Sequence, residues 1–226
     1  MTQQHDPYNA LPARGYAVFN GVRNRAEYLN LIQRLGRPTP QYDGNIMFDV
    51  ARDDSRMQTY YSKGSASIGP HTDGHDLEAP PKYLFLYCIR ASQNNDGATE
   101  VSDFRQIHDN VDTDVRQLLE TRPYVFKSKP KHQEEATREV MPIQCPIYDA
   151  ARSIYRYSTN YISRQSDDAH TKKLVADIAT RHAQSKTSIL LKPGDVLVVA
   201  NHHMLHSRTE FSDPNRLLVR AWASVD

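Results

Sequence analysis

The sequence has little cysteine, no excess charge of either sign and no long apolar run. Its two cysteines, Cys88 and Cys145, form no CxxC pair, which argues against a disulfide framework or a thiolate zinc site. The 28 Lys and Arg residues balance 27 Asp and Glu residues, so the charge predicts neither a nucleic-acid partner nor an anionic membrane partner. No window reaches the roughly 20 apolar residues of a membrane helix, and the first residues lack the apolar centre of a signal peptide. We therefore expect a soluble, cytoplasmic protein whose partner is a small molecule.

The pattern of apolar residues predicts one domain, residues 1–226, that is mainly β with flanking helices. Residues 1–14 are polar and rich in turn formers, and we expect them to form a loose lead-in. Three helices are predicted, at 23–35, 109–119 and 167–182. Strands are predicted at 15–22, 80–90, 98–104, 122–127, 154–162, 188–201 (a strand, a turn and a second strand) and 216–225. Because strands and helices do not alternate throughout, the pattern favours an antiparallel sandwich or jelly roll over a doubly wound parallel sheet.

A histidine and an aspartate, His71 and Asp73, precede the apolar strand at 80–90. On an extended segment, side chains two residues apart point to the same side, so this pair can act as two arms of a clamp. A third ligand is available in NHHMLHSR, residues 201–208, which holds His202, His203 and His206. Two histidines and one carboxylate leave three metal positions open, which is typical of non-haem Fe(II) oxygenases, whereas structural zinc is closed by four protein ligands.

Two arginines near the end of the chain, Arg216 and Arg220, are four residues apart on a predicted strand and therefore share a face. Leu218 and Trp222 lie on that same face, which is typical of a partly buried cavity wall rather than an exposed edge. The guanidinium fork matches a carboxylate. These features indicate a dicarboxylate that chelates the metal at one end and meets an arginine at the other.

Four segments together resemble the taurine dioxygenase and clavaminate synthase-like superfamily of Fe(II)- and 2-oxoglutarate-dependent oxygenases. They are HTD at 71–73, NDGATEVSDF at 95–104, GDVLVVAN at 194–201 and HSRTEFSDPNRLLVRAW at 206–222. HxD alone is a weak signal, but HxD combined with a distal HxR and two arginines ten and fourteen residues after that histidine (216 − 206 and 220 − 206) is much more specific. The resemblance runs from about Gly15 to the C-terminus. It implies a double-stranded β-helix, or jelly roll, with the metal inside its mouth.

The resemblance also implies roles for individual residues. His71, Asp73 and His206 would be the ligands of Fe(II). Arg216 would form the salt bridge to the far carboxylate of 2-oxoglutarate, and the hydroxyl of Thr99 would meet a carboxylate of the same co-substrate. Arg220 would hold either that carboxylate or an anionic group of the substrate.

Three further positions compare with the family pattern. Asn201 matches a frequent asparagine at the end of a strand, and Arg208 reproduces the arginine of HxR. Asp96 replaces a family glycine, which leaves the shape of that turn open. In related halogenases a small residue takes the place of the carboxylate ligand, so the intact Asp73 favours oxygenation.

Substrate-binding residues are harder to select from sequence. His75 and Arg156 are candidates beside Arg220, with a solvated loop as the alternative for His75. Tyrosines at positions 155, 157 and 161 alternate along the predicted strand at 154–162, which is typical of core packing. The remaining histidines lie in polar surroundings and are expected to face solvent: His108, His132, His170 and His182.

The implied activity is hydroxylation or desaturation of an unactivated C–H bond in a small polar metabolite, such as an amino acid or a carboxylate. It would use Fe(II), 2-oxoglutarate and O2, and it would convert 2-oxoglutarate to succinate. One alternative is a cupin-like metal-dependent hydrolase or isomerase, which needs no 2-oxoglutarate and gives Arg216 and Arg220 no role. Another is a jelly-roll binding protein without catalysis, which would be expected to lack a metal ligand. The oligomeric state is left open.

Overall fold

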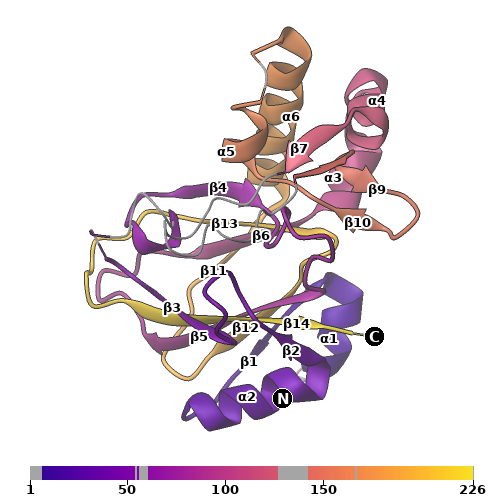
Figure 1. Cartoon of the computed structure of the whole chain (residues 1–226). Helices are drawn as coiled ribbons and strands as arrows, with labels where there is room; N and C mark the ends of the chain where they lie inside the picture. The colour runs from indigo at the N-terminus through magenta and orange to yellow at the C-terminus, as the bar shows by residue number, and fades with distance from the viewer. Residues whose placement is uncertain (1–6, 54, 56–60, 127–141, 166, 226) are drawn as a thin grey trace, which may run out of the picture.

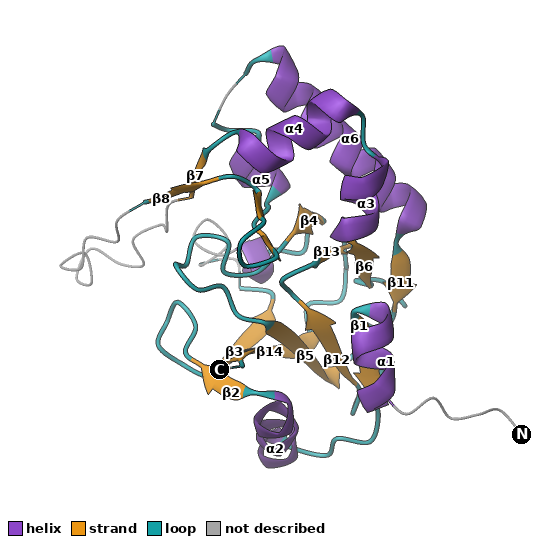
Figure 2. Cartoon of the chain, turned by 90° about the vertical axis from the view of Figure 1, so that its right-hand side faces the viewer, coloured by secondary structure: helices purple, strands orange, loops and turns teal. Residues whose placement is uncertain are grey.

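The computed structural model describes residues 7–53, 55, 61–126, 142–165 and 167–225, and in it two antiparallel sheets face each other (Figure 1). Helices lie on the outer side of each sheet, and the sheets do not close into a barrel (Figure 2). Among the helices of these residues, none has the length and apolar character needed to cross a membrane. The arrangement is mainly β with flanking helices, as the sequence pattern predicts.

The larger sheet has six strands in the order β1-β12-β5-β14-β2, with β3 also paired to β14. The strands are β1 (Tyr16–Phe19), β2 (Arg37–Thr39), β3 (Met47–Ala51), β5 (Tyr83–Arg90), β12 (Val196–Ala200) and β14 (Leu217–Ser224). Every residue of β12 is buried because the strand is covered on both faces. Val196 and Val198 pack toward the outer helices, while Leu197 and Val199 pack in the core between the sheets.

The smaller sheet has four strands in the order β11-β6-β13-β4. They are β4 (Ile68–His71), β6 (Thr99–Asp103), β11 (Thr187–Ile189) and β13 (Met204–Arg208). In the antiparallel pair β13–β4, His206 lies directly opposite His71. Two small two-stranded sheets complete the strands: β7 (Tyr124–Phe126) with β8 (Ile143–Cys145), and β9 (Tyr148–Asp149) with β10 (Ile154–Tyr155).

Helices α1 (Pro7–Arg14) and α2 (Arg25–Leu35) cover the larger sheet. The helices on the other side, over the smaller sheet, are α3 (Phe104–Asn110), α4 (Thr113–Thr121), α5 (Thr159–Ile162) and α6 (Ala169–Ser185), and a short 3-10 turn, η1, spans Tyr61–Lys63. Helix α2, which lies within the predicted range 23–35, begins where the Asn24 side chain accepts a hydrogen bond from the N–H of Glu27, and Gly36 caps its end.

The predicted lead-in at residues 1–14 is wrong for its second half. Residues Pro7–Arg14 form α1, because Leu11 on its inner side is buried against the larger sheet. Residues 1–6 lie outside the described part of the chain. The predicted helix at 109–119 is also wrong in extent: it is divided between α3 and α4, and the first of these ends at a cap on Val111.

Two predicted strand segments differ from the structure. The segment 154–162 is a strand only to Tyr155, because Tyr157 next exchanges hydrogen bonds with Thr72 and the chain then turns into α5. The segment 188–201 is not a hairpin. Its first strand, β11, pairs with β6 in the smaller sheet, while its second, β12, pairs with β1 and β5 in the larger sheet. The KPGD turn therefore connects the two sheets.

Candidate functional site

Three side chains from distant parts of the chain, His71, Asp73 and His206, converge between the two sheets. One ligand atom from each lies within 4.8 Å of the others, and no second such group is found among the described residues. Asp73 Oδ1 is 3.7 Å from His71 Nε2 and 3.6 Å from His206 Nε2. These separations exceed a hydrogen bond and are close to the roughly 3 Å expected between ligands that share one ion at right angles. The arrangement fits a single metal ion held from one side.

His71 is fixed in the tautomer that metal binding needs. Its Nδ1 lies 2.9 Å from the carbonyl oxygen of Gly69, and a carbonyl only accepts, so Nδ1 carries the proton and Nε2 presents a lone pair to the site. Burial, together with the neighbouring His206, lowers the pKa of His71 to about 3. The imidazole is therefore neutral near pH 7. His206 Nδ1 is buried without a hydrogen-bond partner among the described residues.

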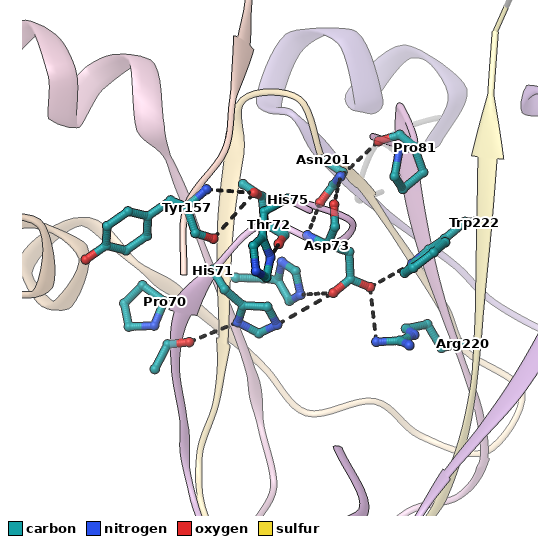
Figure 3. A network of polar contacts seen from close by, with 12 residues as sticks. Pro70, His71, Thr72, Asp73, His75, Pro81, Tyr157, Asn201, Arg220 and Trp222 are labelled. Carbon is teal, nitrogen blue, oxygen red and sulfur yellow. Dashed lines mark hydrogen bonds and ion pairs between the residues drawn. The ribbon is translucent and has the colours of Figure 1, made fainter. Parts of the chain in front are cut away.

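The two oxygens of Asp73 have different surroundings (Figure 3). Oδ1 faces the histidines, whereas Oδ2 accepts a hydrogen bond from Trp222 Nε1 at 2.7 Å and lies 3.3 Å from Arg220 Nη1. Asn201 holds the backbone of Asp73, because its side chain accepts from the Asp73 N–H at 2.7 Å and donates to the Asp73 and Pro81 carbonyls at 2.9 Å. Burial acts to raise the pKa of Asp73, but Arg220 and the two histidines outweigh it and hold the pKa well below its usual range.

A cavity opens beside the three ligands, which themselves form part of its lining. It has an apolar wall from both sheets and, besides the three ligands, several polar and cationic side chains. The residues that line it include Val50, Ile68, Leu84, Leu86 and Leu218 on the apolar side, and Thr99, Arg208, Arg216 and Arg220 on the polar side. The structure thus brings all three residues expected to bind the co-substrate, Thr99, Arg216 and Arg220, to the cavity of the predicted metal ligands.

Arg216 is buried with an unmet hydrogen-bonding group. Its side chain donates to the Gly97 carbonyl at 2.9 Å through Nη2, and Nη1 is buried with no partner among the described residues. The guanidinium lies 4.8 Å from the centre of the Phe211 ring. Burial lowers the pKa of Arg216, yet no carboxylate is hydrogen-bonded to it in the described structure. A buried cation in this state fits a ligand carboxylate.

The turn before β6 shows why Asp96 is accepted where the family has glycine. The Asp96 carboxylate accepts from the Ser212 N–H at 2.8 Å and the Ser212 hydroxyl at 2.6 Å, and also from the Ser92 hydroxyl, so it ties the turn to the loop after β13. The next residue, Gly97, has φ of 73°, and a Cβ there would lie 2.7 Å from Arg216 Nε. The turn is therefore shaped around the Arg216 side chain.

Arg220 contacts a predicted metal ligand, which sequence reasoning missed. Besides its approach to Asp73, its Nε donates to Gln41 Oε1 at 2.7 Å. Its guanidinium also lies 5.2 Å from the ring centre of Phe48 and 5.1 Å from that of Trp222. The contact joins residues 147 positions apart (220 − 73), and no local pattern could have indicated it.

Arg208 holds a neighbouring segment of chain. Its Nη2 donates to the carbonyls of Gly64 at 2.6 Å and Ala66 at 2.5 Å, and Nη1 donates to Ser62 at 3.4 Å. Burial and the nearby Arg216 lower its pKa to about 10. The arginine of HxR therefore organises residues 62–66 at the edge of the cavity.

The two remaining candidates for substrate binding, His75 and Arg156, do not line this cavity. Arg156 is 2% exposed and donates to the backbone carbonyls of His75, Leu77 and Glu78, so it fixes the turn that follows Asp73. His75 Nδ1 donates to the Thr72 carbonyl at 3.2 Å. The structure gives Arg156 a role in holding the backbone instead of the role predicted from the sequence.

The other histidines that the structure describes lie outside the metal cluster. His202 donates to the Pro80 carbonyl at 3.1 Å, while His203 Nε2 is buried with no partner among the described residues. The prediction that His108 and His182 face solvent is wrong, since both are buried. His170 is exposed, as predicted, and His132 lies outside the described residues.

His108 and His182 have hydrogen-bond partners on both ring nitrogens. His182 bridges the hydroxyls of Ser102 and Ser207 at 2.7 and 2.9 Å, and His108 bridges the hydroxyl of Tyr155 and the carboxylate of Glu120 at 2.8 and 3.0 Å. A signal for His182 was present in the sequence, because it continues the stripe of buried residues at positions 174 and 178 of α6.

Comparisons with known proteins agree with this geometry. The sequence model of the family described as "Taurine catabolism dioxygenase TauD, TfdA family" matches residues 3–222. An asparagine oxygenase solved with Fe(II), 2S,3S-3-hydroxyasparagine and succinate is 16% identical, with a TM-score of 0.76 over 94% of this chain and 75% of its own. The non-heme iron oxygenase OrfP, solved with Fe and alpha-ketoglutaric acid, is 18% identical, with a TM-score of 0.72 over 97% of this chain and 78% of its own. At these identities the likeness establishes a shared fold, and the predicted jelly roll is confirmed.

Proposed function

The chain belongs to the TauD/TfdA family of dioxygenases, and we propose that it is an Fe(II)- and 2-oxoglutarate-dependent oxygenase that hydroxylates a free amino acid or a similar small polar metabolite. One observation carries the proposal. A cluster of two histidines and one carboxylate shares a single cavity with a buried arginine, Arg216, that has an unmet donor.

The metal site fits Fe(II) by its donor set. His71 Nε2, His206 Nε2 and Asp73 Oδ1 approach from one side, and this two-histidine, one-carboxylate set leaves positions free for a chelating co-substrate and dioxygen. When bound, iron supplies the redox chemistry in which O2 places one oxygen atom in succinate, as 2-oxoglutarate loses CO2, and the other in the substrate C–H bond. The protein residues supply position and charge for that reaction.

Arg216 and Thr99 are proposed to receive the carboxylate of 2-oxoglutarate that is remote from the metal. Arg216 Nη1 offers a buried donor, and Thr99 lines the same cavity from β6. The apolar wall formed by Leu84, Leu86 and Leu218 excludes water around this ion pair, which strengthens it.

Arg220 is proposed to act first on Asp73 and second on an anion in the cavity. The contacts described for it use Nε and Nη1, and the side chain still lines the cavity. An amino acid is the first substrate class to test, because the similar structures carry hydroxylated asparagine and hydroxylated L-Arg. His75, in the turn after Asp73, remains a candidate for substrate contact.

The alternative of a metal-dependent hydrolase or isomerase explains the cavity less well. Such an enzyme needs a metal-bound water but no dicarboxylate, so the buried donor of Arg216 would stay unmet during its reaction.

Substrate-stimulated turnover of 2-oxoglutarate tests the proposal. Protein loaded with Fe(II) would be mixed with 2-oxoglutarate, air and one member of a panel of free amino acids and small carboxylates. We expect at least one compound to raise succinate formation and to gain one oxygen atom by mass spectrometry. A product lacking two hydrogens would instead indicate desaturation. If 2-oxoglutarate neither binds nor is consumed, with or without any panel member, the proposed function is wrong.

A further inference from the structure

The two oxygens of the Asp73 carboxylate have different partners, and metal binding alone does not require this difference. Among the contacts of the described residues, those of Oδ1 are with the two histidine nitrogens, at 3.6 and 3.7 Å. Oδ2 receives the Trp222 indole N–H at 2.7 Å and faces Arg220 Nη1 at 3.3 Å (Figure 3). A donor to a carboxylate forms a charge-assisted hydrogen bond, which is stronger than a neutral one.

Trp222 is held firmly in place as a donor. It is 1% exposed and lies on β14, where its backbone is opposite Leu84 of β5 and Thr39 of β2. The ring of Tyr42 packs edge-on against its indole at 5.1 Å. The indole N–H therefore has one fixed direction, toward Oδ2.

Arg220 is also fixed as a donor. Gln41 Oε1 accepts from its Nε, and Gln41 is itself anchored because its Nε2 donates to the carbonyls of Ile46 and Arg220, each at 3.0 Å. The guanidinium lies between the rings of Phe48 and Trp222. Among the described residues, the Trp222 hydrogen bond and the Arg220 ion pair therefore both fall on Oδ2, and neither falls on Oδ1.

A carboxylate can bind a metal through one oxygen or through both. Binding through both would fill one of the positions that a chelating co-substrate or dioxygen needs. We propose that Trp222 is a positioning residue which, together with Arg220, withholds Asp73 Oδ2 from the metal, so that Asp73 occupies one coordination position. This inference rests on the proposed function, because it assigns the freed position to 2-oxoglutarate or dioxygen.

The variant Trp222→Phe keeps an aromatic ring and removes the N–H donor. The readouts are the dissociation constants of Fe(II) and of 2-oxoglutarate, measured anaerobically, together with the visible spectrum of Co(II) bound in place of iron. We expect 2-oxoglutarate affinity to fall by about tenfold or more, because Oδ2 then competes for its position. Metal affinity changes much less, because the second oxygen that reaches the metal offsets the effect of the lost donor, and the Co(II) spectrum shifts before any co-substrate is added. Unchanged 2-oxoglutarate affinity, or a parallel loss of both affinities, overturns the inference.

Tyr28→Phe is the matched control. Tyr28 is fully buried, and its hydroxyl donates to the carbonyls of Phe85 and Val219 in the same sheet, on the face away from the cavity. This variant also loses a buried donor, so its stability falls while both affinities stay at the wild-type values. A drop in 2-oxoglutarate affinity for Tyr28→Phe as large as that for Trp222→Phe assigns the effect to general destabilisation and overturns the inference.

The wild-type protein provides a test that does not depend on a variant folding. Infrared difference spectra of metal binding, with ¹³C-labelled aspartate, separate one-oxygen from two-oxygen coordination by the spacing of the two carboxylate stretches. We expect the wide spacing of one-oxygen coordination, and the narrow spacing contradicts the inference. If wild-type protein binds Fe(II) but never 2-oxoglutarate, the proposed function fails; if it binds both and Trp222→Phe behaves identically, only the positioning role fails.

Discussion

The two ends of the cavity are built differently. At the metal end, His71 Nδ1 donates to the Gly69 carbonyl. Asp73 Oδ2 accepts a hydrogen bond from Trp222 and forms an ion pair with Arg220, and Asn201 holds the Asp73 backbone. At the anion end, Arg216 is almost fully buried but leaves Nη1 without a partner among the described residues. His206 Nδ1 is an exception at the metal end, because it too is buried and unpaired.

This difference indicates which part of the site the protein completes by itself. Buried polar groups in folded proteins are nearly always hydrogen-bonded, and an unpaired buried charge costs several kcal/mol. The metal end is therefore organised before any ligand arrives, whereas the anion end is completed when a carboxylate binds. Variants at the metal end should therefore lower the stability of the protein itself. Variants at the anion end should mainly lower its affinity for the ligand carboxylate.

The largest expected effect is at the metal end, with His206→Ala. Loss of one of three ligands should weaken Fe(II) binding by more than about 100-fold, since even changes to residues behind the ligands cost 10–100-fold. Anaerobic calorimetry measures it. The matched control is His203→Ala, three residues away, whose Nε2 is also buried without a partner among the described residues; this variant should bind Fe(II) as the wild type does. Equal affinities in the two variants would contradict the ligand assignment.

The second-largest effect is expected at the anion end, from a change to Arg216. Arg216→Met should reduce 2-oxoglutarate affinity by about 3 kcal/mol, or roughly 100-fold, because it removes the partner of a buried carboxylate. Iron affinity should not change. Urea unfolding should show a small stability loss, because the variant also removes an incompletely paired buried charge.

Arg208→Met is the comparison for that stability measurement. The Arg208 guanidinium bonds three backbone carbonyls in residues 62–66, so its loss leaves acceptors unmet and should cost about 2 kcal/mol. If Arg216→Met destabilises the protein as much as Arg208→Met does, Arg216 is already fully paired without a ligand. This result would contradict the difference between the two ends of the cavity.

A smaller effect is expected from Asn201→Ala at the metal end. It removes three hydrogen bonds that hold the backbone at Asp73 and Pro81, so we expect a stability loss of about 2 kcal/mol and roughly tenfold weaker iron binding. Thermal unfolding and iron titration measure the two. Asn20→Ala, which removes an exposed bond to Asp195, should change neither quantity.

The last effect is the one farthest from the ligands, on the outer face of the smaller sheet, where stability should depend on pH even without the metal. Burial lowers the pKa of His182 to about 4, with Glu100 raising it and Lys186 lowering it. The unfolded chain, with an ordinary histidine pKa near 6.5, binds the proton more readily, so the contribution to stability is complete above about pH 6.5 and is lost as pH falls toward 4. His182→Gln should reduce the slope of stability against pH in this window by at most about 1.4 kcal/mol per pH unit. Urea unfolding from pH 4 to 7 measures it, and an unchanged slope contradicts the assignment. The exposed His170→Gln is the control.

The sequence predicts which residues meet at the site better than it predicts the contacts that hold those residues in place. His71, Asp73, His206 and Arg216 belong to short patterns with fixed spacing, and the structure places all four around one cavity. The bonds from Trp222 and Arg220 to Asp73 join segments about 150 residues apart, and no spacing rule encodes them.

The same limit appears in the fold. The two apolar runs in 188–201 correctly predict two strands but not that they belong to different sheets, because an apolar run indicates that a strand is buried and does not indicate its neighbour. Arg156 shows the limit for a single side chain: the sequence makes it a candidate for substrate binding, and tertiary packing directs it to three backbone carbonyls.

The central claim is that one ferrous ion binds to His71, Asp73 and His206 and leaves room for 2-oxoglutarate beside Arg216. The most direct measurement is an anaerobic titration of the protein with Fe(II), followed by 2-oxoglutarate, while the visible spectrum is monitored. The account predicts a weak charge-transfer band that saturates at one iron and one 2-oxoglutarate per chain, is absent in His206→Ala, and needs much more 2-oxoglutarate in Arg216→Met. A wild-type protein that binds Fe(II) without developing the band, or a band that is unchanged in both variants, would contradict it.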